Sequence, residues 1–240
     1  SCSSDGIHVK CGDTTVRGNT VSGCGRDAIS IDGGRGSLVE SNRILDGSIG
    51  VRVAGEAHTI QNNCIVRCRE SGIDVPAATA DGGTPAENIV VERNTFARYG
   101  TNSPDSAVIM IDRASTCVIQ RNLFHESSTP YRYRSAMEGN ASGKHRPSSF
   151  MADNLCTQAH GDVQGCRVET VEFADAARDD FQNASGYGAT GWVTGPRPCT
   201  PDLAGEEDDG SGIDADASIE NDACDAVDDE GETIDRSEER

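Results

Sequence analysis

Residues 6–25, GIHVKCGDTTVRGNTVSGCG, contain two short apolar couplets separated by a polar loop, with an asparagine inside the second couplet. The same order returns at residues 28–47, AISIDGGRGSLVESNRILDG, and at residues 50–68, GVRVAGEAHTIQNNCIVRC. Self-similarity with a period of 20–50 residues is typical of proteins built from stacked repeats. This stretch therefore predicts a repeat architecture.

The second couplet has the form apolar-x-x-Asn-x-apolar and occurs six times. Its asparagines are Asn19, Asn42, Asn63, Asn94, Asn122 and Asn154, spaced by 23, 21, 31, 28 and 32 residues. The longer spacings indicate the same repeat with loops inserted, at residues 77–88 and around residues 138–149. We expect these asparagines to be structural and to stack at a bend, because Asn tolerates the left-handed backbone conformation and bonds to neighbouring backbone.

The first couplet of each repeat alternates apolar and polar residues, which is typical of a strand with one buried face. The inward pairs are Ile7 and Val9, Ile29 and Ile31, Val51 and Val53, Ile73 and Val75, and Ile109 and Ile111. Such short strands cannot bury their apolar side alone, so successive coils must stack in parallel about 4.8 Å apart. The sequence therefore predicts an all-β fold, a right-handed parallel β-helix of the pectin lyase-like type, over about residues 5–195.

The two ends of the chain differ from the repeats. The chain lacks an initial methionine and enters the repeat almost at once, so we expect a processed or excised piece of a longer protein. Residues 171–192, VEFADAARDDFQNASGYGATGW, look like the segment that closes many β-helix domains, so we place the domain at residues 1–200. Residues 201–240 hold 17 acidic residues and two arginines, which predicts a disordered acidic tail.

Charge and hydropathy exclude two classes of partner. The formal net charge of −19 belongs mostly to the tail, and nothing forms a basic stripe, so we expect no nucleic-acid binding. No run approaches the ~18 apolar residues of a membrane span, so we expect no such span. We also expect a monomer.

The ten cysteines are even in number and none forms C-x-x-C, which indicates an oxidising compartment. We therefore expect a secreted protein, extracellular or periplasmic. Candidate disulfides are Cys156 with Cys166 and Cys199 with Cys224. Cys24 and Cys68 should not pair, because they occupy equivalent places two coils apart, roughly 9.6 Å, beyond the ~7 Å limit between Cα atoms.

Stacking the first couplets creates two outward columns. One carries His8, Ser30, Arg52, Asp74 and Met110, and the other carries Lys10, Asp32, Ala54, Pro76 and Asp112. The simplest interpretation is a solvated sheet face on which opposite charges neutralise each other across coils. Farther along, Tyr131, Arg132, Tyr133 and Arg134 suit stacking on sugars and pairing with carboxylates, unless two of the four point into the core.

The stretches GIHVKCGDTTVRGNTV, LVESN and IGVRVAGEAHTIQNN resemble the core of polysaccharide lyase family 6, the chondroitinase B and alginate lyase family. The resemblance covers roughly residues 5–66 and implies β-elimination of a uronic-acid polysaccharide with calcium on the uronate. It places Lys10 on the base that removes the C5 proton. It also implies metal-binding acids five and seven residues earlier, where this chain has Asp5 and Ser3.

One position departs from the family pattern. The family's arginine, which helps to protonate the leaving oxygen, falls on Asp32. An anion beside Lys10 would raise the pKa of a base that must lose its proton near neutral pH. Arg52 or Arg35 would have to supply the missing positive charge.

Three functions remain open at this point. The first is a lyase-type protein that acts on or binds uronic-acid polysaccharides of the alginate or chondroitin type, with Lys10 and Arg52 as catalytic residues. The residues expected to contact its substrate are His8, Asp32, Glu56, His58, Asp74, Arg132 and Arg134. The second is a non-catalytic carbohydrate-binding or structural β-helix, and the third a β-helix glycosidase using Asp32, Asp74 and Asp112.

Overall fold

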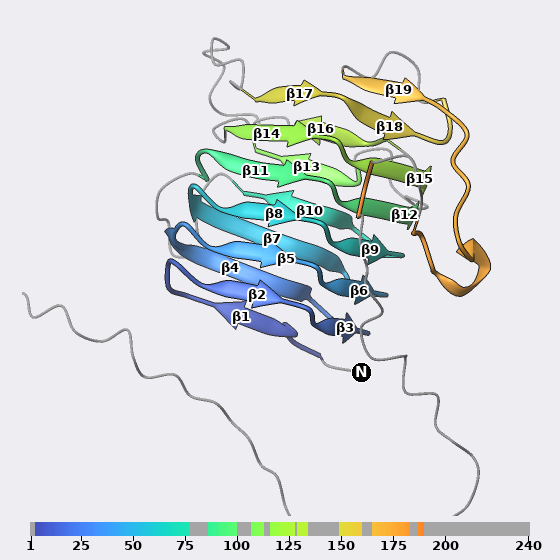
Figure 1. The fold of residues 1–240 in the computed structure, drawn as a ribbon. Helices are drawn as coiled ribbons and strands as arrows, with labels where there is room; N and C mark the ends of the chain where they lie inside the picture. The colour runs from blue at the N-terminus through green and yellow to red at the C-terminus, as the bar shows by residue number, and fades with distance from the viewer. Residues whose placement is uncertain are drawn as a thin grey trace, which may run out of the picture. The chain divides into compact units, whose positions relative to one another are not determined.

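The computed structural model describes residues 3–76, 86–99, 107–112, 116–127, 129–133, 149–159, 165–182 and 187–189. The described chain winds into a parallel β-helix whose coils stack along one axis (Figure 1). This confirms the predicted architecture. Contacts between Cα atoms divide the chain into the units Ser1–Arg197 and Pro198–Arg240, and the predicted acidic tail lies outside the described residues.

The first sheet contains the alternating couplets. Its strands, in the order in which they pair, are β1 (Ile7–Val9), β4 (Asp27–Arg35), β7 (Ile49–Glu56), β10 (Ser71–Val75), β13 (Ile109–Ile111) and β16 (Tyr131–Tyr133). The register pairs Ile7 with Ile29 and Val9 with Ile31. The predicted inward residues are buried, except that Ile7 in the first coil is partly exposed.

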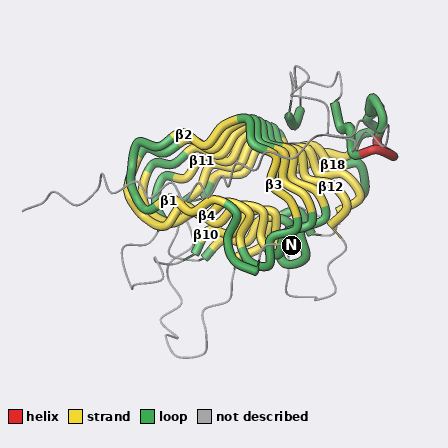
Figure 2. The backbone as a smooth tube through the Cα atoms, turned by 90° about the horizontal axis from the view of Figure 1, so that it is seen from below, coloured by secondary structure: helices red, strands yellow, loops and turns green. Residues whose placement is uncertain are grey.

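Two further sheets complete each coil and enclose the core with the first sheet (Figure 2). The second sheet contains β2 (Thr15–Arg17), β5 (Leu38–Glu40), β8 (Thr59–Gln61), β11 (Ile89–Glu92), β14 (Cys117–Gln120) and β17 (Phe150–Ala152). The third contains β3 (Thr20–Ser22), β6 (Arg43–Leu45), β9 (Cys64–Val66), β12 (Thr95–Tyr99), β15 (Leu123–Ser127), β18 (Asn154–Cys156) and β19 (Cys166–Val168). No helix in the described residues is long and apolar enough to cross a membrane.

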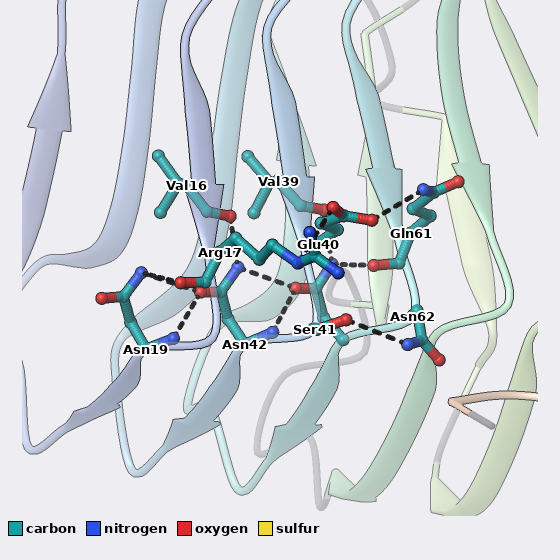
Figure 3. A network of polar contacts seen from close by, with 10 residues as sticks. Val16, Arg17, Asn19, Val39, Glu40, Ser41, Asn42, Gln61 and Asn62 are labelled. Carbon is teal, nitrogen blue, oxygen red and sulfur yellow. Dashed lines mark hydrogen bonds and ion pairs between the residues drawn. The ribbon is translucent and has the colours of Figure 1, made fainter. Parts of the chain in front are cut away.

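The six asparagines form one column between the second and third sheets, as predicted. The backbone N–H of Asn19 donates to the Oδ1 of Asn42 at 3.0 Å, and that of Asn42 donates to the Oδ1 of Asn63 at 2.9 Å (Figure 3). The same bond continues through Asn94 and Asn122 to Asn154. From Asn42 upward the column is fully buried, so these side chains satisfy backbone groups that water cannot reach.

The left-handed backbone conformation at this bend belongs to the residue before each asparagine. Positive φ angles occur at Gly18, Ser41, Asn62, Arg93, Arg121 and Asp153. The expectation that the column uses the left-handed tolerance of asparagine was therefore wrong. Its amide hydrogen bonds explain the residue choice, and the position before it accepts several residue types.

The segment predicted to close the domain runs along the outer face of the third sheet (Figure 1). Phe181 packs on Cys64, Val66 and Ala97, and a 3₁₀ helix, η1 (Ala176–Arg178), precedes it. The Asp179 carboxylate accepts hydrogen bonds from Arg67 and Arg98, each at 2.7 Å. We call residues 171–182 the closing segment; it fastens neighbouring coils from outside.

The described cysteines are free thiols. Cys24 and Cys68 are not bonded to each other, as predicted. The sulfurs of Cys156 and Cys166 lie 2.9 Å apart, longer than the ~2.05 Å of a disulfide bond. The expected neighbours are thus together in the reduced form, and the pair Cys199 and Cys224 lies outside the described residues.

Candidate functional site

The outer face of the first sheet gathers the charged residues that the sequence singled out. The register aligns His8, Ser30, Arg52, Asp74 and Met110 in one column, as predicted, and adds Arg132 above them. Between β16 neighbours the Tyr131 ring packs against the core, 6.5 Å from Phe124, so it faces away from this surface. Arg134 lies outside the described residues.

Lys10 directly follows β1 and is exposed. The carboxylate of Asp32, one coil above, lies 3.8 Å from the Nε2 of His8, and the Nδ1 of His8 lies 3.9 Å from Asp5. Across the part of the chain that the structure describes, no ion pair joins Lys10 to an acidic side chain. The neighbouring anion is thus aligned with His8, and the Lys10 ammonium faces solvent.

Arg52 lies in an acidic setting. It aligns with Asp74 of the next coil, which is 3% exposed, and it is close enough to Asp27 to influence its ionisation. Burial and the neighbouring Asp5 raise the pKa of Asp27, whereas Arg52 acts in the opposite direction. These carboxylates fix the place of the Arg52 guanidinium and partly neutralise its charge.

Glu56 and His58 have different surroundings although they are two residues apart. Glu56, at the end of β7, is half-buried, and its carboxylate lies 3.6 Å from Arg35. His58 is fully buried, and its Nδ1 accepts a hydrogen bond from the backbone N–H of Ser37 at 3.0 Å. Burial lowers the pKa of His58. The ring is therefore a packing residue of the corner, and we leave it out of the proposed binding surface.

The described residues do not fit the calcium ion that the family resemblance implied. The Oδ1 of Asp5 accepts a hydrogen bond from the backbone N–H of Asp27 and lies 3.7 Å from Arg26, a cation that would repel a metal ion. Within the described ranges, no group of three or more His, Cys, Asp or Glu side chains is arranged to hold a metal. Calcium needs six to eight oxygen ligands, so we derive no step through it.

The long connections of the chain all flank this sheet. Residues 76–88 follow β10, residues 100–108 precede β13, and residues 134–149 follow β16. In the lower coils, by contrast, β4 and β7 are separated from the second sheet by residues 36–37 and 57–58 alone. Long connections in a repeat protein collect on the binding face, so this pattern favours the first sheet as the functional one.

The sequence pattern of the family described as right handed beta helix region matches residues 1–122, slightly more than half of the chain. The chain belongs to this family. Its handedness is therefore the one predicted from the repeats. No curated protein matches the sequence.

Two solved structures resemble the chain. One is a mutant of AlyGC, a PL6 family alginate lyase, with 16% identity, a TM-score of 0.54, and coverage of 78% of this chain and 28% of that one. The other is AlyGC without that mutation, with 15% identity, a TM-score of 0.51, and coverage of 77% and 27%. At these identities the likeness shows a shared fold, which agrees with the resemblance seen in the sequence. The chain spans less than a third of the length of AlyGC.

Sequence reasoning missed Asp27, which belongs to the same charged surface. Its position before the alternating couplet, in RDAISID, gave it no place in the two outward columns. The corner carries it onto the outer face, where it aligns with Ile49 of the next coil and Ser71 of the one after. A strand-only pattern cannot reveal this, because side-chain alternation is interrupted at the corner.

Proposed function

We propose that this protein binds a uronic-acid polysaccharide across the outer face of the first sheet and cleaves it by β-elimination, with Lys10 as the base. The observation that carries the proposal is the setting of Lys10, exposed and without an acidic ion-pair partner while Asp32 faces His8. The anion that would have held its proton is therefore directed elsewhere. The fold shared with AlyGC, a PL6 family alginate lyase, supports the substrate class.

In this reaction the neutral Lys10 amine takes the proton at C5 of the uronate. The C–H electron pair forms the C4–C5 double bond, the bond from C4 to the glycosidic oxygen breaks, and that oxygen receives a proton from water. The coil spacing places Arg52 two coils above Lys10, about 9.6 Å along the axis. Both side chains are long, so they can bracket one sugar unit, with Arg52 offsetting the negative charge that develops.

A second candidate is binding without cleavage on the same surface. The observation that favours it is the partial neutralisation of Arg52 by buried Asp27 and Asp74. The glycosidase alternative has less support, because Asp32 and Asp112 are about 14 Å apart by coil count, beyond the ~9.5 Å of an inverting pair, and Asp74 is buried. We further propose that the protein is secreted, where such polymers occur.

The test is incubation of the full chain with alginate, chondroitin sulfate and dermatan sulfate while following the ultraviolet absorbance of the unsaturated product. We expect Lys10→Ala to abolish this product with an unchanged fold, because an exposed side chain leaves no cavity. Arg178→Ala, which removes an exposed cation from the 3₁₀ helix, is the matched control and should keep full activity. Binding without product in the unaltered protein would leave the non-catalytic candidate.

A further inference from the structure

The outer face of the second sheet carries a polar column that the function above does not use. It consists of the residue that follows the buried position of each strand, Arg17, Glu40, Gln61, Glu92 and Gln120. The Gln61 Nε2 donates to Glu40 at 3.0 Å, and the Gln120 Nε2 donates to Glu92 at 2.8 Å. Figure 3 shows the lower part of this column, where Arg17 also approaches Glu40 at 3.3 Å.

A second column runs beside it, made by the residues with positive φ. In it the Asn62 Nδ2 donates to the Ser41 hydroxyl at 3.1 Å, and Arg121 lies 3.7 Å from Asp153 (Figure 3 for the first pair). Arg93, between Asn62 and Arg121, is exposed, and no carboxylate in the described part of the chain forms an ion pair with it. Its guanidinium is therefore available to an external anion.

The two columns enclose a shallow pocket of about 200 Å³, lined by Glu40, Gln61, Asn62 and Arg93. This volume is below the roughly 300–1,000 Å³ of pockets for drug-sized ligands, so it suits one small unit. The lining combines a guanidinium, a carboxylate and two amides. Such a lining offers hydrogen bonds in both directions but no apolar platform.

The chemistry of the lining selects the ligand. A guanidinium binds a carboxylate through two parallel hydrogen bonds, and the Glu40 carboxylate accepts hydrogen bonds from hydroxyl groups. The Gln61 Oε1 also remains an acceptor, because its Nε2 is the atom bonded to Glu40. A bare anion such as phosphate would face repulsion from Glu40, and a neutral sugar would leave Arg93 unused.

We propose that this pocket binds a hydroxylated carboxylate, the chemistry of a single uronic-acid unit, at a site on a different sheet from Lys10 and Arg52. Its carboxylate lies on Arg93, and its hydroxyls donate to Glu40 and Gln61. The unit can be a free sugar acid or one residue of a polymer. Binding here does not depend on cleavage at the first sheet.

The test is calorimetric titration of the full chain with glucuronate, an oligouronide, glucose and inorganic phosphate. We expect binding of the two carboxylated ligands, and Arg93→Ala should weaken it about tenfold or more, the effect of losing hydrogen bonds to a charged group. Gln61→Ala should weaken it less. The matched controls, Arg121→Ala and Gln120→Ala, remove the same groups one coil higher, outside the pocket, and should leave the affinity unchanged.

The arms separate the sources and the alternatives. Tighter binding of the oligouronide per site than of glucuronate identifies a polymer unit, whereas equal binding identifies a free sugar acid. Lys10→Ala should retain this binding, so failure of the lyase proposal and failure of this one are distinguishable. Equal losses for Arg93→Ala and Arg121→Ala, equal binding of glucose or phosphate, or no binding at all would overturn the proposal.

Discussion

Asn94 illustrates at the scale of one residue why the repeat contains an asparagine. Its Nδ2 donates to the carbonyls of Ile60 and Glu92, and its Oδ1 accepts from the backbone N–H of Asn63. We expect Asn94→Ala to lower the free energy of unfolding by about 3 kcal/mol or more, because several buried backbone groups lose their partners. Urea unfolding measures this.

Asn19 provides the comparison for that prediction. It lies in the first coil and is partly exposed, and its Nδ2 bond to the Arg17 carbonyl is solvent-accessible. Asn19→Ala should cost about 1 kcal/mol or less, since water replaces the lost bonds. Equal losses for the two variants would contradict the account of the column as a device for buried backbone.

The cysteines give a second prediction at this scale. Burial raises the pKa of Cys64 and of Cys117 to about 12 each and that of Cys68 to about 11, so these thiols are protonated at neutral pH. Because the thiolate is the reactive form, they should resist iodoacetamide in the folded protein and react once urea unfolds it. The hydrogen bond from Cys166 lowers the pKa of Cys156, so that pair should react first. Mass spectrometry of the labelled peptides reads both outcomes.

At the scale of elements, the closing segment links coils that are otherwise joined through their strands. Asp179 is the central contact, with its side chain 15% exposed between Arg67 and Arg98. We expect Asp179→Ala to lower the free energy of unfolding by about 1–3 kcal/mol and to speed hydrogen exchange in residues 171–182. Asp175→Ala, which removes an exposed pair with Arg178, should change stability by less than about 1 kcal/mol.

The same segment should respond to pH through His125, whose ring lies 4.5 Å from that of Phe173. Burial lowers the pKa of His125 below its ordinary value of 6.5, with Glu126 opposing this and Arg98 adding to it. The unfolded chain then binds the proton more readily, so stability is full above pH 6.5 and falls as the pH drops below it. Hydrogen exchange in residues 171–182 should be faster at pH 5 than at pH 7, and His125→Gln should reduce the difference.

At the scale of the whole molecule, the repeats predicted the sheets and the asparagine column because each coil obeys the same local pattern. The docking of the closing segment could not be predicted, since the bond from Arg67 to Asp179 joins positions that no period relates. The polar column of the second sheet was visible in VESN, IQNN, VERN and IQRN, but attention to the asparagines obscured the residue two places before them. The setting of His58 inside a corner likewise depends on three-dimensional packing.

The asparagine column also has a direction, because every side-chain amide donates toward the carbonyl of the next coil, from Asn19 up to Asn154. Aligned bonds of this kind polarise one another, so the column carries a dipole along the axis. At its upper end the backbone N–H of Asn154 donates to the carbonyl of Gly165 instead of to another asparagine. A second molecule therefore finds no vacant donor there through which to continue the column, which opposes head-to-tail growth into fibres.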